Sequence, residues 1–98
     1  MYGTIAQLRL RKNAEGRLHE VMNGMEDRHV DGFIASYVYR LDNDPQDLML
    51  AVLFTGREAY ERNADDPAQD VQFRELRQLL ERDPEWHDGE VIWSSTLP

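Results

Sequence analysis

The run LMLAVLF at residues 48–54 constrains the fold most, because every position in it is apolar. Alternation along a strand divides the run into two apolar faces, one formed by Leu48, Leu50, Val52 and Phe54 and the other by Met49, Ala51 and Leu53. An antiparallel strand with one wet face would instead alternate apolar and polar residues. The strand is therefore predicted to need cover on both faces.

The flanking segments predict alternating strands and helices. A strand over 2–11 is expected to turn Ala6, Leu8 and Leu10 to one face. The other expected elements are a helix from about 16 to 29, strands at 33–41 and 48–55, helices at 57–64 and 66–82, and a last strand at 86–95. With right-handed crossovers, this β-α-β-β-α-β order gives an α+β, ferredoxin-like fold with a four-stranded antiparallel sheet.

The helices suffice to cover only one face of such a sheet. The second strand is also apolar on both sides, with Phe33, Ala35, Tyr37 and Tyr39 expected on one face and Ile34, Ser36 and Val38 on the other. The area of a bare apolar sheet face would exceed that of the apolar patches that monomers usually expose. A homodimer through the sheet face is therefore predicted. A monomer whose termini fold across the sheet remains the alternative.

Composition narrows the functional classes. Residues 1–98 are expected to form a single domain without a targeting segment. The absence of cysteine excludes disulfides and Cys-based metal sites, and a formal charge of −8 argues against nucleic acid and anionic membranes as partners. A cytoplasmic protein is the resulting expectation.

The three histidines differ in their surroundings. His19 is expected to be solvated, and His29 to lie at the C-terminal end of the first helix. His87 is a candidate general base if its face of the last strand lines a pocket. Alternation leaves only Glu85 on its side, so no metal site is expected there. The strand should place Trp86, Asp88 and Glu90 on the other side, and Val91, Ile92 and Trp93 should enter the core.

Three stretches resemble the antibiotic biosynthesis monooxygenase domain family of the dimeric α+β barrel superfamily. They are VDGFIASYVYR at 30–40, LMLAVLFTGREAYERNADDPAQD at 48–70 and LLERDPEWHDGEV at 79–91. The resemblance implies a dimeric α+β barrel with a pocket between the sheet and the helices of each subunit. It also implies oxygenation of activated phenols without metal or flavin, in which the deprotonated substrate itself reduces O₂.

The resemblance and the strand pattern together supply candidate site residues. The catalytic candidates are Tyr37, Tyr39, Asn63 and His87, and the substrate-binding candidates are Gln7, Phe33, Phe54, Tyr60, Phe73 and Trp93. Many family members carry a histidine shortly after a Glu-Ala pair, which is Glu58-Ala59 in this chain. Asn63 stands at the position of that histidine here, and an amide is not a base at neutral pH. Packing explains the tyrosines equally well.

These features predict a cofactor-independent monooxygenase acting on a small aromatic or polyketide-type substrate. A non-catalytic, dimeric protein that binds a small apolar or aromatic molecule is the alternative, which the missing histidine favours. An isomerase or lyase that uses one carboxylate or histidine as base is a third reading. Haem degradation is disfavoured, because the long helix lacks a tryptophan and no axial histidine follows it.

Overall fold

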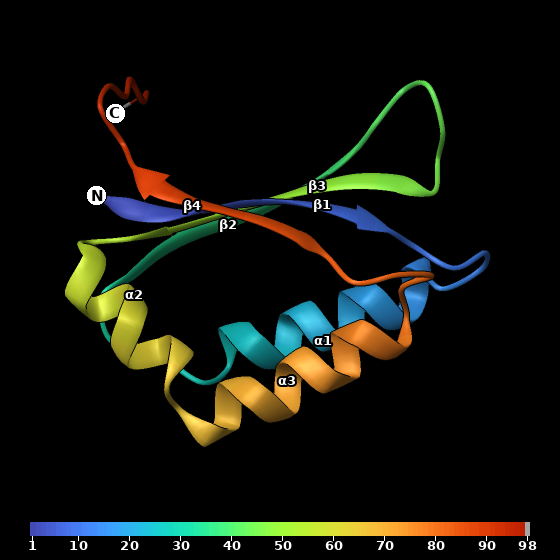
Figure 1. Cartoon of the computed structure of the whole chain (residues 1–98), viewed down its shortest axis with the longest axis horizontal. Coiled ribbons are helices and arrows are strands. Elements are labelled where there is room, and N and C mark those ends of the chain that lie inside the picture. Colours follow the sequence, from blue (N-terminus) through green and yellow to red (C-terminus); the bar gives the residue numbers. More distant parts are fainter. Residues whose placement is uncertain (98) are drawn as a thin grey trace.

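The computed structural model describes residues 1–97, which form one antiparallel sheet with all helices on one side (Figure 1). The elements are β1 (Tyr2–Arg9), α1 (Glu15–Glu26), β2 (Phe33–Arg40), β3 (Asp47–Phe54), α2 (Arg57–Ala64), α3 (Pro67–Gln78) and β4 (Glu85–Glu90). The strands run in the order β2-β3-β1-β4 across the sheet. The predicted ferredoxin-like α+β fold is confirmed.

The core lies between the sheet and the helices. Leu8 of β1 and Leu80, which follows α3, have at most 1% of their surface exposed. The other buried members are Ala6, Leu10, Leu18, Val21, Leu48, Leu50 and Leu76. The expected alternation of β1 and β3 is therefore confirmed, because their even-numbered apolar residues meet the helices.

A β-bulge in β2 overturns one prediction from the sequence. Phe33 pairs with Phe54, yet Ala35 pairs with Leu53, so the register shifts at residue 34. One extra residue reverses the side to which the following side chains point. Tyr37 and Tyr39 consequently share the outer face with Ala51 and Met49, their partners in β3. The prediction that Phe33 lies on the same face as these tyrosines is wrong.

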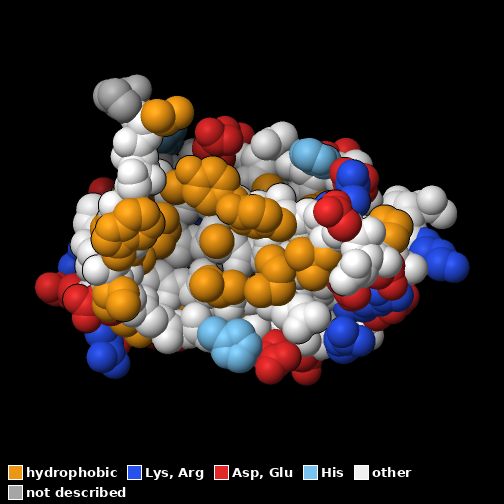
Figure 2. Space-filling model, turned by 90° about the horizontal axis from the view of Figure 1, so that it is seen from above, with side chains coloured by type: hydrophobic (Ala, Val, Ile, Leu, Met, Phe, Trp, Pro, Cys, Tyr) orange, Lys and Arg blue, Asp and Glu red, His pale blue; other side chains and the backbone are white. Residues whose placement is uncertain are grey.

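The outer face of the sheet, called here the open face, carries an apolar band with no helix over it (Figure 2). Ile5 of β1 is 52% exposed, and Tyr39 of β2 is 59% exposed. A shallow hollow of about 260 Å³ lies between them, bordered also by Leu41 and Met49. The sheet thus has apolar side chains on both faces, as its sequence predicts.

The last strand is shorter than predicted. Glu90 pairs with Tyr2 at the start of β1, and Val91 then donates one backbone hydrogen bond to Met1. Beyond this point β4 has no partner backbone, so residues 91–97 form no strand. The expectation that Ile92 and Trp93 enter the core is wrong, since they are 95% and 80% exposed. This tail rises from the sheet on its open side (Figure 1).

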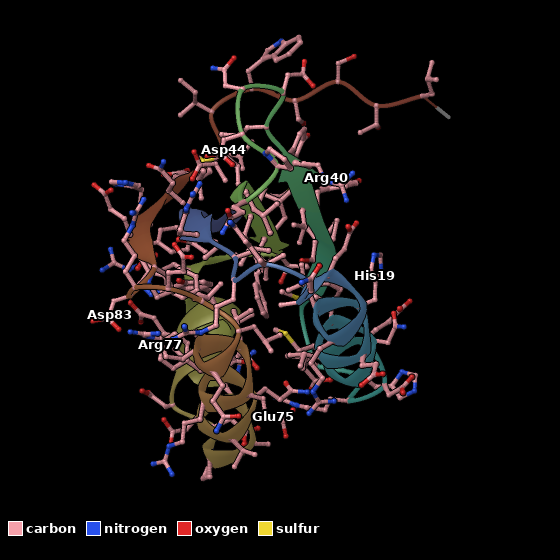
Figure 3. All side chains as sticks on the ribbon, turned by 90° about the vertical axis from the view of Figure 1, so that its right-hand side faces the viewer. His19, Arg40, Asp44, Glu75, Arg77 and Asp83 are labelled. Atoms are coloured by element: carbon pink, nitrogen blue, oxygen red, sulfur yellow. The ribbon has the colours of Figure 1, made fainter. Side chains whose placement is uncertain are left out.

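Ion pairs fix the end of the molecule where the β2–β3 loop lies. Arg9 donates to Asp44 at 2.7 Å and to Asp47 at 3.0 Å. The pKa of Asp44 is lowered, first by the backbone N–H of Gln46 and then by Arg9. Figure 3 shows this end, where Arg77 of α3 also donates to Asp83 at 2.6 Å.

None of the helices formed by residues 1–97 has the length and apolar character that crossing a lipid bilayer requires.

Candidate active site

A cleft of about 1140 Å³ opens between the sheet and the helices. Its volume is slightly above the range of about 300 to 1,000 Å³ that is usual for small-molecule binding sites. The apolar lining comes from β2, β3, α1, α3 and β4, and includes Met22, Phe33, Val52, Phe54, Phe73, Leu76 and Trp86. Two groups of polar side chains interrupt this lining.

Aromatic rings form part of the wall. Phe54 contacts both Phe33 and Tyr60 edge-on, with ring centroids 5.8 and 5.7 Å apart. Phe73 of α3 and Trp86 of β4 lie 6.0 Å apart in a tilted arrangement. Such surfaces suit a flat aromatic molecule, because ring pairs favour edge-on and offset contacts.

The first polar group joins α2 to β4. Tyr60 donates its hydroxyl to Asp88 at 2.8 Å. Asp88 faces the cleft because it pairs with Thr4, whose side chain points toward the helices. Burial, followed by the hydrogen bond to Asp88, raises the pKa of Tyr60 to about 12. Tyr60 therefore stays protonated at neutral pH and holds the Asp88 carboxylate in place.

Thr4 adds a buried hydroxyl to this group. It is 6% exposed, and its Oγ1 makes no hydrogen bond of acceptable geometry. It lies close enough to the Tyr60 oxygen to oppose slightly the rise in the pKa of that tyrosine. A buried polar atom without a partner is costly, and this oxygen is itself closed to solvent.

The second polar group gathers amides around Arg28. The chain leaves α1 through Arg28 and His29, whose φ of 51° ends the helical path. The guanidinium donates to Gln72 Oε1 at 2.6 Å, to Asn63 Oδ1 at 3.0 Å and to Gln69 Oε1 at 3.3 Å. Arg28 and its three amide partners all border the cleft.

The structure brings some of the predicted site residues together and separates others. Phe33, Phe54, Tyr60, Asn63 and Phe73 border the cleft. On the open face, Gln7 pairs with Met49 and Glu85, while His87 pairs with Ile5.

The predicted tyrosines and Trp93 lie elsewhere. Tyr39 borders the hollow of the open face. Tyr37 reaches the rim of the cleft, but its register partner Ala51 belongs to the open face. Trp93 lies in the exposed tail.

Asp88, Thr4 and Arg28 were not among the candidates from the sequence. The alternation of β4 does separate Asp88 from His87, and this separation is confirmed by the pairing with β1. That alternation could have identified Asp88 once the cleft side of β4 was known. Nothing local marks Arg28, whose partners lie 35 to 44 residues away.

Among residues 1–97, no three His, Cys, Asp or Glu side chains are grouped so that they could hold a metal ion. Within the cleft, the Asp88 carboxylate can accept a proton and the Arg28 guanidinium can donate to oxygen atoms.

Solved structures of antibiotic biosynthesis monooxygenases share this fold. SnoaB, a cofactor-independent oxygenase from Streptomyces nogalater, has this fold with a TM-score of 0.81 and 14% identity, over 95% of this chain and 94% of SnoaB. A candidate antibiotic biosynthesis monooxygenase from Deinococcus radiodurans matches with a TM-score of 0.78 and 14% identity, over 100% of this chain and 99% of that protein. Rv0793 from Mycobacterium tuberculosis matches with a TM-score of 0.76 and 18% identity, over 97% of this chain and 98% of Rv0793.

The sequence itself matches no protein-family model and no curated protein. At identities of this size the likeness establishes the fold.

Proposed function

We propose that the cleft is the active site of a cofactor-independent oxygenase that acts on a small aromatic or polyketide-type substrate. The observation that carries the proposal is the Tyr60–Asp88 pair, a carboxylate that borders the cleft beside its aromatic wall and accepts a hydrogen bond of 2.8 Å. The fold shared with SnoaB, a cofactor-independent oxygenase, supports the reaction class.

In this reaction Asp88 removes a proton from an activated C–H or phenolic O–H of the substrate. The resulting anion gives electrons to O₂, and the two combine into a peroxide anion, which takes back the proton from Asp88. Loss of water then converts an anthrone-type CH₂ group into a carbonyl, so one oxygen atom enters the product and the other leaves as water. Tyr60 keeps its proton throughout and orients Asp88.

Oxygen uptake with 1,8-dihydroxyanthrone tests the proposal. Asp88→Asn should lower kcat by about a hundredfold or more, which is the usual loss when a general base is removed. Glu85→Gln is the matched control, because it removes a carboxylate from the open face of the same strand. Uptake no faster than in buffer, or equal rates for Asp88→Asn and Glu85→Gln, would contradict the proposal.

A non-catalytic binding protein is the second candidate, and the state of Asn63 favours it. The amide oxygen of Asn63 accepts from Arg28, and its nitrogen donates to Gln69 at 3.3 Å. Asn63 therefore contributes to the architecture of the cleft rather than offering a free catalytic group. Tight binding of anthrone-type molecules without oxygen uptake would identify this second function.

We also propose that two copies associate through their open faces. The apolar band of Figure 2 supports this, because residues of β1, β2 and β3 contribute to it and no helix among residues 1–97 covers it. An isologous dimer would bury the band of each subunit against that of the other. The exposed tail at residues 91–97 lies on the same side and would contact the partner.

A further inference from the structure

We infer that the cleft binds aromatic molecules that carry an anionic group, and that Arg28 selects for this group. The inference rests on the proposed function, since it takes the cleft to be the substrate site. It adds a charge requirement that neither the fold nor the reaction demands.

Arg28 is a partly desolvated cation. Its side chain is 18% exposed, compared with 53% for Arg40 and 54% for Arg17. The amides of Asn63, Gln69 and Gln72 accept hydrogen bonds from three of its five N–H groups and hold the guanidinium at the edge of the apolar lining.

The hydrogen-bond partners of Arg28 are neutral, which sets it apart from Arg9, whose side chain is 20% exposed. Arg9 donates to three carboxylates at 2.7, 3.0 and 3.3 Å. The carboxylate nearest to Arg28 is that of Asp66 at 3.8 Å, beyond hydrogen-bond distance. The other oxygen of Asp66 accepts from the N–H of Ala68 and caps α3. Much of the charge of Arg28 therefore remains available, in surroundings where ionic attraction is stronger than in water.

Other charges on the cleft wall define how a ligand would lie. Asp70 pairs with Arg74 at 2.8 Å, and Asp88 accepts from Tyr60. Glu26 and His29 also border the cleft. An anionic group is repelled from Asp88 and attracted to Arg28, so the reacting carbon is directed toward the carboxylate that takes its proton.

The two polar groups are within reach of one molecule. Tyr60, the partner of Asp88, and Asn63, a partner of Arg28, are three residues apart on α2. Residues with this spacing lie on one helix face, about 4.5 Å apart along the axis. A ligand of two or three fused rings spans this separation while its body contacts the aromatic wall.

Two fluorescent probes that differ only in charge test the inference. 1-Anilinonaphthalene-8-sulfonate is the sulfonated, anionic form of N-phenyl-1-naphthylamine. Arg28→Gln should weaken binding of the sulfonate by about tenfold or more, as expected when an ionic hydrogen bond is lost. Binding of the neutral probe should stay within about twofold, since the apolar wall is unchanged.

Matched variants separate a charge effect from a structural one. Arg17→Gln removes a cation from the exposed side of α1, where Arg17 pairs with Glu20, and should leave both probes unaffected. Arg28→Lys keeps the charge but breaks the amide contacts, and should retain most of the affinity for the sulfonate. If Arg28 were only a structural clamp, Arg28→Lys and Arg28→Gln would weaken both probes equally, and the inference would be overturned.

Salt dependence of the wild-type protein gives a second measurement that needs no variant. Added sodium chloride should weaken the sulfonate but not the neutral probe, because ions screen charge and leave apolar contacts intact. Parallel salt curves, or no binding of the sulfonate, would refute the inference. Selective binding of the sulfonate without oxygen uptake would refute the proposed oxygenase activity and leave the inference about Arg28 standing. Oxygen uptake by Arg28→Gln with an unchanged KM for anionic substrates would refute the role of Arg28 and leave the oxygenase activity standing.

Discussion

The substitution Ile5→Ala offers a quantitative test of association through the open face. Ile5 pairs with Ala51 and His87 in the centre of this face and is 52% exposed. Full burial of an isoleucine side chain contributes about 1.5 to 3 kcal/mol, so covering the exposed half contributes about 1 kcal/mol. In an isologous dimer each substitution occurs twice, and the loss is therefore about 2 kcal/mol. At 1.4 kcal/mol per factor of ten, the dissociation constant should rise about thirtyfold.

Sedimentation equilibrium over a dilution series measures this change directly. The matched control is Val71→Ala on α3, because Val71 is 55% exposed but lies on a helix, away from the open face. Val71→Ala should leave the dissociation constant unchanged. Urea unfolding of both variants would show whether the single chain itself is altered.

Two results would refute the reasoning. A wild-type protein that sediments as a monomer throughout the micromolar range would show that the apolar band does not drive association. Equal shifts for Ile5→Ala and Val71→Ala would show that a dimer exists but uses another surface.

Three further predictions concern stability and titration. Gly3→Ala should destabilise the protein by about 3 kcal/mol in urea unfolding, because its Cβ would lie 1.8 Å from the backbone oxygen of Val52 in the neighbouring strand; an unchanged midpoint would contradict this. The pKa of Asp44 is lowered in the folded state, first by the backbone N–H of Gln46 and then by Arg9, so these hydrogen bonds stabilise the fold above the ordinary value of 3.8, and the stabilisation is lost as pH falls through the folded pKa. The Tm difference between wild type and Asp44→Asn should accordingly vanish in acid, and a difference that persists there would count against it. Because the pKa of Tyr60 is raised, the 295 nm absorbance difference between wild type and Tyr60→Phe should develop above pH 10.0 and toward 12; a difference complete by pH 10.0 would disagree.

The sequence determined the secondary structure and much of the packing, because both depend on local patterns. The uniformly apolar run of β3 predicted a strand that needs cover on two faces. In the structure, helices cover one face of the sheet, and the other face carries a bare apolar band. Asp66 and Pro67 marked the start of α3, where Asp66 accepts from the N–H of Ala68. Periods of two and of 3.6 residues carry this information, and they do not require knowledge of distant partners.

The site depended on tertiary structure, because its groups come together from distant parts of the chain. The bulge at residue 34 moved Tyr37 and Tyr39 to the open face, and no alternation rule reveals a bulge before the partner strand is known. Asp88 became a candidate base only when pairing with β1 turned it toward Tyr60, 28 residues away. Arg28 gained its amide partners from two helices that pack beside the end of α1. Local pattern sets which side chains share a face, whereas the packing of strands and helices decides which faces meet.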